Sequence, residues 1–140
     1  MAEETNQLRV RLVTPERTLF EHAVAAVELP AKSGYMEVLY GAAPLVAELG
    51  AGDVIVRGGP DGDQHYNVSW GFAEVLPDRV TILASDALKP EEIDVPRAQQ
   101  QLERGHKQWC EAGASEEAYD QALRVIAEAE AKLATAAEKR

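Results

Sequence analysis

The sequence contains a single cysteine among its 140 residues, and this scarcity excludes two kinds of architecture. Cys110 alone cannot form an internal disulfide framework or a zinc site built from several cysteines. Long apolar runs are also missing, since no stretch approaches the ~20 residues of a membrane-spanning helix. The N-terminal MAEETNQL has neither the basic flank nor the apolar segment of a signal peptide. We therefore expect a soluble, cytoplasmic protein.

Basic side chains are few, with 14 Lys and Arg against 24 Asp and Glu, which gives a net charge of -10. This balance argues against nucleic-acid binding, which requires clustered Lys and Arg against phosphates. The acidic excess is spread evenly, because residues 1–90 carry 7 basic and 13 acidic side chains and residues 91–140 carry 7 and 11. Neither part is therefore a charged tail. The length suits one ordinary core with an appended element.

Recognisable catalytic and metal-binding motifs are absent. The three histidines, His22, His65 and His106, have no second ligand type nearby at metal-binding spacing. The sequence has no phosphate-binding glycine loop, no nucleophile elbow and no dinucleotide fingerprint, and its carboxylates are scattered. We predict no catalytic residues, no metal site and no enzymatic activity of the chain itself.

The first 85 residues consist of short apolar runs separated by Gly and Pro. Alternation predicts a half-buried strand before the turn at Pro15, and a second one before Pro30. The residues expected to point inward in these strands are Leu8, Val10, Leu12, Ala25, Val27 and Leu29.

Residues 53–70 are typical of a hairpin around Gly-Pro-Asp-Gly, and residues 71–85 of two more strands around the turn at Pro77. Tyr66 and Trp70 fall on the inward phase of the hairpin, so core packing is the favoured role of both, although Trp70 could instead meet a partner. Many short strands at close spacing predict an all-β sandwich or flattened barrel.

After Ala87 the apolar period changes to that of a helix. The apolar face of the first predicted helix includes Gly105, which either weakens the helix or lets another backbone approach closely. The turn is expected at CEAGAS, with Ser115 as N-cap of a second helix. That helix has alanines at 122, 129 and 136 between its larger seam residues. The residues predicted to form the seam between the two helices, apart from these alanines of the second helix, are Ala98, Leu102, Trp109, Tyr119, Ile126 and Leu133.

These patterns predict an α+β chain of two parts. Residues 1–88 would form the β-sandwich, and residues 89–140 an antiparallel two-helix hairpin whose helical part spans residues 95–139. An alanine-rich seam buries little surface, so we expect the hairpin to dock weakly or to move.

Four motifs resemble one family, the epsilon subunits of F-type ATP synthases, called delta in mitochondria. They are VTPERTLF at 13–20, GAAPLV at 41–46, GFAEVLPDRVTILA at 71–84 and IDVPRA at 93–98. They occur in the order and spacing of the family and precede an Ala-rich helical hairpin. The resemblance therefore covers nearly the whole chain.

The resemblance implies a non-catalytic central-stalk subunit of a rotary, proton- or ion-translocating ATP synthase. In the family the sandwich binds the gamma subunit and rests on the ring of c subunits. The hairpin folds onto the sandwich or extends along gamma to the alpha and beta subunits, where it restrains ATP hydrolysis. The implied location is the cytoplasmic face of the bacterial plasma membrane, with membrane association only through the complex. No cofactor is required.

The family's c-ring-facing region corresponds to the segment that follows Pro30. Its apolar side chains, with Met36 among them, are unusual for a solvent-exposed loop. Glu37 stands where the family often has glycine, and Tyr40 and Ala42 replace its usual proline and histidine. The resemblance assigns to this c-ring-facing loop Lys32, Ser33, Gly34, Tyr35, Leu39, Tyr40 and Ala42.

The stretch EEIDVPRA at 91–98 has two interpretations. As a helix start it should place Pro96 at the first helical position, and because Pro96 has no N–H to offer, capping explains Asp94 poorly. The second interpretation is ligand binding, because I/L-D-x-x-R-A binds ATP in some bacterial members of the family. The residues that match that site are Ile93, Asp94, Arg97, Ala98 and Arg104.

Two positions weaken the nucleotide interpretation. Glu128 and Lys132 stand where nucleotide-binding relatives have arginines, and a carboxylate beside polyphosphate is repulsive. ATP is therefore expected only as a weak regulatory ligand. A rival hypothesis is a free-standing nucleotide-sensing module that switches its helices without any synthase.

Overall fold

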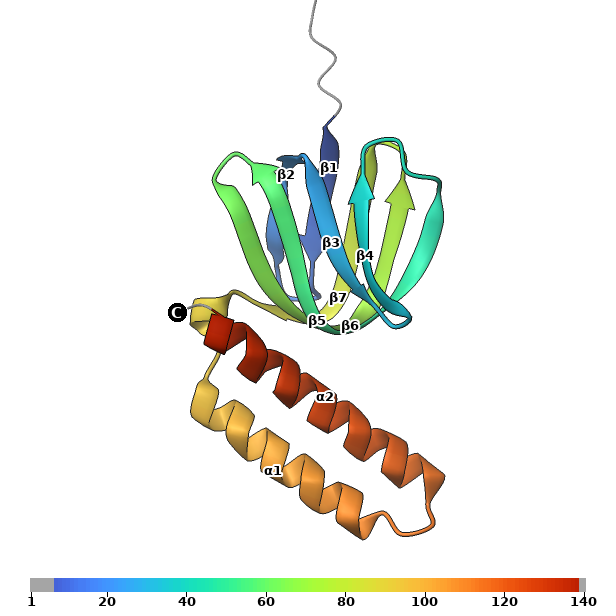
Figure 1. Cartoon of the computed structure of the whole chain (residues 1–140), viewed down its shortest axis with the longest axis vertical. Coiled ribbons are helices and arrows are strands. Elements are labelled where there is room, and N and C mark those ends of the chain that lie inside the picture. The colour runs from blue at the N-terminus through green and yellow to red at the C-terminus, as the bar shows by residue number, and fades with distance from the viewer. Residues whose placement is uncertain (1–6, 139–140) are drawn as a thin grey trace, which may run out of the picture. The chain divides into compact units, whose positions relative to one another are not determined.

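The computed structural model describes residues 7–138, which form a β unit followed by a helical unit (Figure 1). The contacts between residues divide the chain after Ala87, one residue from the expected boundary. None of the helices in the described part is long and apolar enough to span a membrane. The elements are β1 Leu8–Val13, β2 Thr18–Val24, β3 Ala26–Ala31, β4 Gly34–Leu39, β5 Leu45–Gly59, β6 Gly62–Leu76, β7 Arg79–Leu88, the 3-10 turn η1 Pro90–Glu92, α1 Val95–Glu111 and α2 Glu116–Glu138.

The strands form one sheet in the order β2-β1-β7-β6-β5-β3-β4. β1 pairs antiparallel with β2 and parallel with β7, while β3 pairs antiparallel with both β4 and β5. The sheet folds over on itself because β5 and β6, each 15 residues long, curve through both layers (Figure 1). The predicted α+β fold, a sandwich followed by two helices, is confirmed.

Two adjacent residues of β6, Trp70 and Gly71, have positive φ values. Trp70 has a φ of 56° and Gly71 a φ of 145°, both in the region that favours glycine. A Cβ at Gly71 would overlap the carbonyl oxygen of Leu83, so only glycine fits this close approach of β6 to β7. β6 runs from Gly62 to Leu76 as one strand, so the expectation of separate strands before and after Trp70 is wrong. Trp70 itself is half-buried rather than a core residue, whereas Tyr66 is buried as predicted.

The core lies between the two layers, and β1 supplies it as predicted, since Leu8, Val10 and Leu12 are all buried. In β3 the predicted phase is correct for Val27 and Leu29.

Two expectations for β3 are wrong. Ala25 is exposed, because it precedes β3 at a turn where its N–H donates to the carbonyl of Arg57. Pro30 does not follow the strand but lies inside it, buried, and β3 continues to Ala31.

The start of α1 corrects the analysis of EEIDVPRA. Asp94 is the N-cap, and its Oδ1 accepts a hydrogen bond of 3.1 Å from the backbone N–H of Arg97. Pro96 therefore occupies the second helical position rather than the first. The missing N–H of Pro96 does not matter, because a cap can use the third helical N–H in place of the second.

The two helices pack closely at Gly105. A Cβ there would lie 2.8 Å from Cγ1 of Ile126 and 3.2 Å from its backbone N, so the glycine permits close approach of α2. This decides between the two roles considered for Gly105. Ser115 caps α2 as predicted, because its Oγ accepts from the N–H of Ala118. The turn is shorter than CEAGAS, however, since α1 continues to Glu111.

The hairpin seam is buried mainly through its small residues. Ala98, Ala122 and Ala129 are fully buried, whereas Ile126 and Leu133 are half-buried. At the end of the seam nearest the turn, the rings of Trp109 and Tyr119 lie with centroids 5.9 Å apart, and both side chains are exposed. The other seam residues, Leu102 and Ala136, are half-buried.

Candidate functional site

The segment expected to form one c-ring-facing loop is mostly a strand. Gly34–Leu39 is β4, at the edge of the sheet, and its six residues span roughly 17 Å. The predicted residues therefore separate into two groups at opposite ends of β4. The Lys32 turn comprises Lys32, Ser33, Gly34 and Tyr35, and the Tyr40 loop comprises Leu39, Tyr40 and Ala42.

The Lys32 turn is held firmly against β5. The N–H of Lys32 donates to the carbonyl of Glu48, and its Nζ lies 3.2 Å from a carboxylate oxygen of the same residue. Tyr35 is exposed, yet its hydroxyl oxygen accepts a 3.1 Å hydrogen bond from the N–H of Asp53. Gly52 leaves room for this hydroxyl, because a Cβ there would lie 2.5 Å from it. The turn thus presents an ordered aromatic ring at the surface.

The Tyr40 loop is attached to a different part of the sandwich. The N–H of Gly41 donates a 2.7 Å hydrogen bond to the carbonyl of Pro77, in the turn between β6 and β7. Leu39 and Tyr40 are exposed, whereas Ala42 and Met36 pack against the core. Of the apolar residues in this segment, only part is therefore available to a partner.

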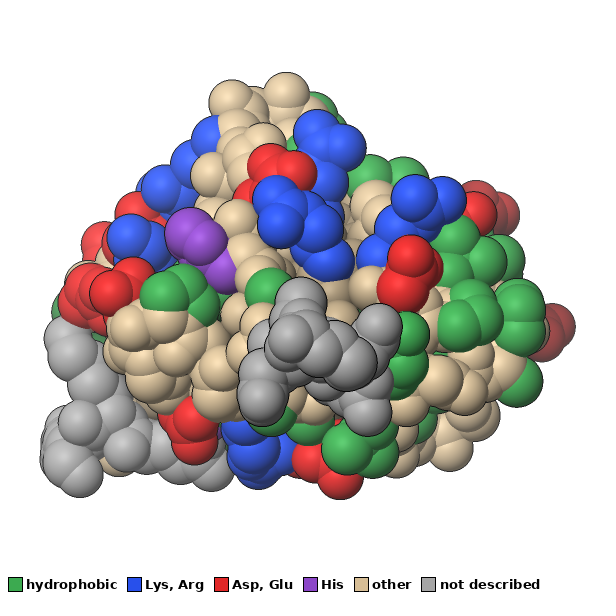
Figure 2. All heavy atoms as spheres, turned by 90° about the horizontal axis from the view of Figure 1, so that it is seen from above, with side chains coloured by type: hydrophobic (Ala, Val, Ile, Leu, Met, Phe, Trp, Pro, Cys, Tyr) green, Lys and Arg blue, Asp and Glu red, His purple; other side chains and the backbone are tan. Residues whose placement is uncertain are grey.

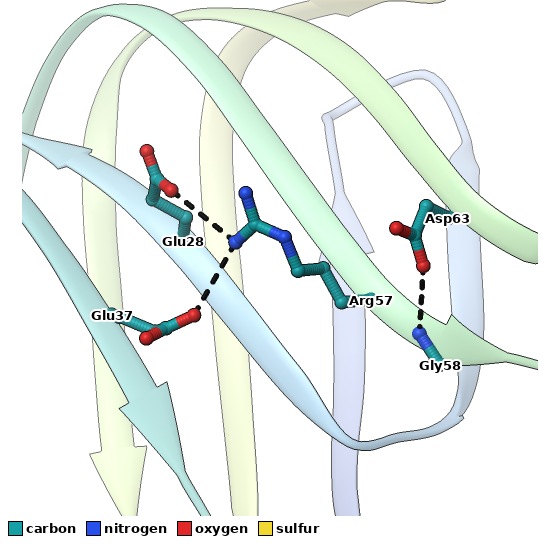
Figure 3. A network of polar contacts seen from close by, with 5 residues as sticks. All are labelled: Glu28, Glu37, Arg57, Gly58 and Asp63. Atoms are coloured by element: carbon teal, nitrogen blue, oxygen red, sulfur yellow. Dashed lines mark hydrogen bonds and ion pairs between the residues drawn. The ribbon is translucent and has the colours of Figure 1, made fainter.

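Glu37, which replaces a common family glycine, belongs to a polar network across three strands (Figure 3). Nη1 of Arg57 on β5 lies 3.3 Å from a carboxylate oxygen of Glu37 on β4 and 3.4 Å from one of Glu28 on β3. Glu28 and Glu37 are direct neighbours across the strands, so Arg57 offsets their repulsion. The departure from the family pattern thus has a local electrostatic explanation.

The outer face of the other layer carries an apolar surface that the sequence analysis did not identify. Val46, Phe72 and Leu83, on β5, β6 and β7, are 69%, 55% and 54% exposed. Val46 is paired with Glu74 and Phe72 with Glu48, which makes Val46 and Phe72 diagonal neighbours. We call these three residues the outer stripe. The signal was present, because the runs GFAEV and RVTIL place apolar residues on both phases of their strands.

The outer stripe is unusual for a solvent-facing sheet surface. An antiparallel sheet with one face in water normally presents polar side chains on that face. Figure 2 shows one end of the molecule, where hydrophobic side chains gather on one side and Lys and Arg side chains beside them. Exposed apolar groups bounded by polar ones mark contact surfaces.

The residues proposed for nucleotide binding are only partly available. Asp94 caps α1, Ala98 is buried in the seam and Ile93 is half-buried. Arg97 and Arg104 are exposed and lie seven residues apart, about 10 Å along the helix.

A hollow between the helices indicates which side of the hairpin these arginines share. Gln108 lines it together with Val125 of α2. Arg97 and Arg104 precede Gln108 by eleven and four residues, which places them on the same side of α1. Glu128 lines the neighbouring hollow with Val125. The structure thus brings both arginines and Glu128 to one side of the hairpin, and Lys132, one turn beyond Glu128, continues that side.

Within residues 7–138, no group of three or more His, Cys, Asp or Glu side chains is arranged to hold a metal ion.

Comparison with known proteins identifies the family. The family model for the β-sandwich domain of the ATP synthase delta/epsilon chain matches residues 7–90. The ATP synthase epsilon chain of Solibacter usitatus is 40% identical over 132 residues, which cover 94% of this chain and 97% of the relative. The chain belongs to the ATP synthase delta/epsilon family. The epsilon chain of Koribacter versatilis is 41% identical over 104 residues, 73% of this chain and 71% of the relative.

A solved structure supports the same family. A chain in the cryo-EM structure of the Euglena gracilis mitochondrial ATP synthase, OSCP/F1/c-ring in rotational state 1, superposes with a TM-score of 0.78 at 25% identity. The match covers 98% of this chain and 84% of that one, helices included. Membership confirms the predicted family and the prediction that the chain is an accessory, non-catalytic subunit of the ATP synthase.

Proposed function

We propose that this delta/epsilon chain couples the gamma subunit to the c ring in the central stalk of an F-type ATP synthase. The observation that carries the proposal is the outer stripe. Phe72 and Leu83 are more than half exposed on one sheet face, and exposed apolar groups gathered in this way mark a contact surface. The epsilon-chain relatives and the match to a chain of an F1/c-ring complex support the assignment. The complex would lie at the cytoplasmic face of a bacterial plasma membrane, with this chain attached peripherally.

Coupling requires two separate surfaces, and the β unit offers them. We assign the outer stripe to gamma and the Lys32 turn to the c ring, because Tyr35 is an exposed ring held in place by Asp53. The Tyr40 loop is attached to the β6–β7 turn, at the other end of β4. It therefore belongs with the gamma-facing side rather than with the ring.

Cysteine crosslinking in the assembled synthase tests this assignment. A cysteine at Ser33 should crosslink to loops of the c subunits, and a cysteine at Ala43 should not. The chain's own exposed Cys110 is first replaced by serine, so that the new thiol is the only one in this subunit. Crosslinking from Ala43 but not from Ser33 would reverse the two ends, and none from either would place the ring contact elsewhere.

We further propose that the hairpin restrains ATP hydrolysis only mildly. Its seam is narrow enough to exchange α1 for gamma, and a few kcal/mol between two states suffices for switching. Residues 115–140 hold 4 basic and 6 acidic side chains, so approach to acidic loops of the beta subunits would be repulsive. Hydrolysis by the assembled enzyme should therefore rise only modestly when residues 91–140 are deleted. A large activation would contradict this part.

ATP binding by the hairpin should be feeble. By helical spacing from Gln108, Arg97 and Arg104 lie on the side of the hairpin that Glu128 shares, and the Glu128 carboxylate opposes polyphosphate. Titration of the purified chain with ATP should show no micromolar affinity, and Glu128→Arg should tighten binding while Glu130→Arg, on an exposed position, should not. Micromolar binding by the unmodified chain would favour the rival nucleotide-sensing role.

A further inference from the structure

Three arginines form a compact group on the outer face of the β unit. Arg9 and Arg79 are direct neighbours on the parallel strands β1 and β7, and Arg11 is the next outward residue along β1. All three are exposed and line one hollow of about 400 Å³. Only 7 basic residues occur in residues 1–90, so nearly half of them are gathered here. We call Arg9, Arg11 and Arg79 the arginine cluster.

The cluster is incompletely neutralised by the chain itself. Glu21 of β2 and Glu74 of β6 line the same hollow. The contact between Arg9 and Glu21 is long, at 4.0 Å. Among the described residues, the side chains of Arg11 and Arg79 make no hydrogen bond or ion pair. Like charges directly opposite each other on neighbouring strands are destabilising. The chain has ten more acidic than basic side chains, yet it places Arg9 directly opposite Arg79. This arrangement points to a role of the two arginines outside the fold.

The arginine cluster adjoins the outer stripe on the same surface. Arg11 is paired with Thr81 and Val13 with Leu83, so the cluster lies one row from Leu83. Glu74, which lines the hollow, is paired with Val46. One continuous face across β1, β7, β6 and β5 thus offers apolar contact at one side and guanidinium groups at the other.

We propose that this face receives a protein segment that presents carboxylates beside apolar side chains, with Arg11 and Arg79 binding the carboxylates. Guanidinium groups match carboxylates through paired N–H donors, and complementary charge fixes the register of an interface. A nucleic acid does not fit, because the chain's overall charge repels phosphates. The proposal rests on the function proposed above and adds to it the chemistry of the gamma surface.

Binding of the full-length chain to purified gamma subunit tests the proposal, with affinities measured at low and high salt. Arg11→Glu with Arg79→Glu should weaken binding at low salt by about tenfold or more, since like-charge contacts at an interface are costly. Phe72→Ser should weaken it at both salt concentrations. Arg79→Glu alone is compared with Lys107→Glu on α1, which makes the same change in net charge and should have little effect. Circular dichroism verifies that each variant is folded.

The outcomes separate the two proposals. If Phe72→Ser loses gamma binding while the arginine variants bind normally, the coupling function stands and the arginine inference is wrong. If Phe72→Ser and Val46→Ser also bind normally, this face is not the gamma surface and both fail. A third outcome is that the arginine variants bind gamma normally but no longer bind vesicles of anionic lipid. That outcome would assign the arginine cluster to a membrane and would overturn the inference.

Discussion

The β unit and the helical unit bury apolar side chains in different ways. In the β unit, large residues such as Leu8, Val68 and Ile82 are completely buried between the layers. In the hairpin, the fully buried seam residues are alanines, while Ile126 and Leu133 stay half-buried. Burial of a Leu, Val or Ile side chain contributes about 1.5–3 kcal/mol, and an alanine methyl contributes about 0.8 kcal/mol. Stability is therefore concentrated in the β unit, and the hairpin is the part that can change its packing at low cost.

The largest expected effect is loss of core volume in the β unit. Ile82→Ala should lower the free energy of unfolding by about 2–5 kcal/mol, because the cavity forms between two layers that cannot collapse freely. The neighbouring Leu83 is exposed, so Leu83→Ala should change the free energy of unfolding by only about 0.5 kcal/mol. Urea denaturation of both variants measures the difference. Equal effects would mean that the core is not where the structure places it.

A smaller effect is expected from filling the helix contact. Gly105→Ala should destabilise the hairpin by about 1–3 kcal/mol, because the new methyl lies too close to Ile126 and Val125. This outweighs the gain of about 1 kcal/mol that alanine normally brings to a helix. Helical circular dichroism should melt earlier than in Glu103→Ala, an exposed substitution in the same helix. A higher melting temperature for Gly105→Ala than for Glu103→Ala would show that α2 moves away from the new methyl group without loss of stability.

Removal of the cap should have a still smaller effect. Asp94→Ala should cost the hairpin about 1 kcal/mol, because the N–H of Arg97 loses its acceptor, while Asp94→Asn should retain most of that stability. Hydrogen exchange of the first turn of α1 measures the change locally. If Asp94→Asn were as damaging as Asp94→Ala, the side chain would act through its charge rather than as a cap.

The smallest effect on the β unit should come from deleting residues 91–140. The strands carry their own core, so the truncated chain should keep its β-sheet circular dichroism and unfold cooperatively. The full chain and the truncated chain are compared at equal concentration. An unfolded truncated chain would remove the contrast between a self-sufficient β unit and a dependent hairpin.

Much of the fold could be predicted because it depends on local patterns. Alternation predicted the buried face of β1, and helical spacing predicted the seam positions that are buried, Ala98, Ala122 and Ala129. The serine before the second helix predicted the cap at Ser115. The errors arose where distant residues decide the outcome. The positive φ values of Trp70 and Gly71 accompany the close approach of β7 to Gly71, which no local pattern records.

The candidate sites were less predictable for the same reason. The reason for Glu37 lies in Arg57, twenty residues away, and the arginine cluster exists only because β1 and β7 pair in parallel. The capping role of Asp94 was not predicted because Pro96 has no N–H at the second helical position, whereas the cap uses the N–H of Arg97 at the third.

The two long curved strands have a mechanical consequence. A sandwich assembled from separate sheets is held together across its middle by side-chain contacts alone, and those contacts resist sliding poorly. Here β5 and β6 pass through both layers as a hydrogen-bonded pair that runs from Leu45 and Val75 to Gly59 and Gly62. Sliding one layer over the other would require this backbone ladder to break. The β unit should therefore resist shear as a single elastic body and transmit a sideways force applied at one face to the other with little deformation.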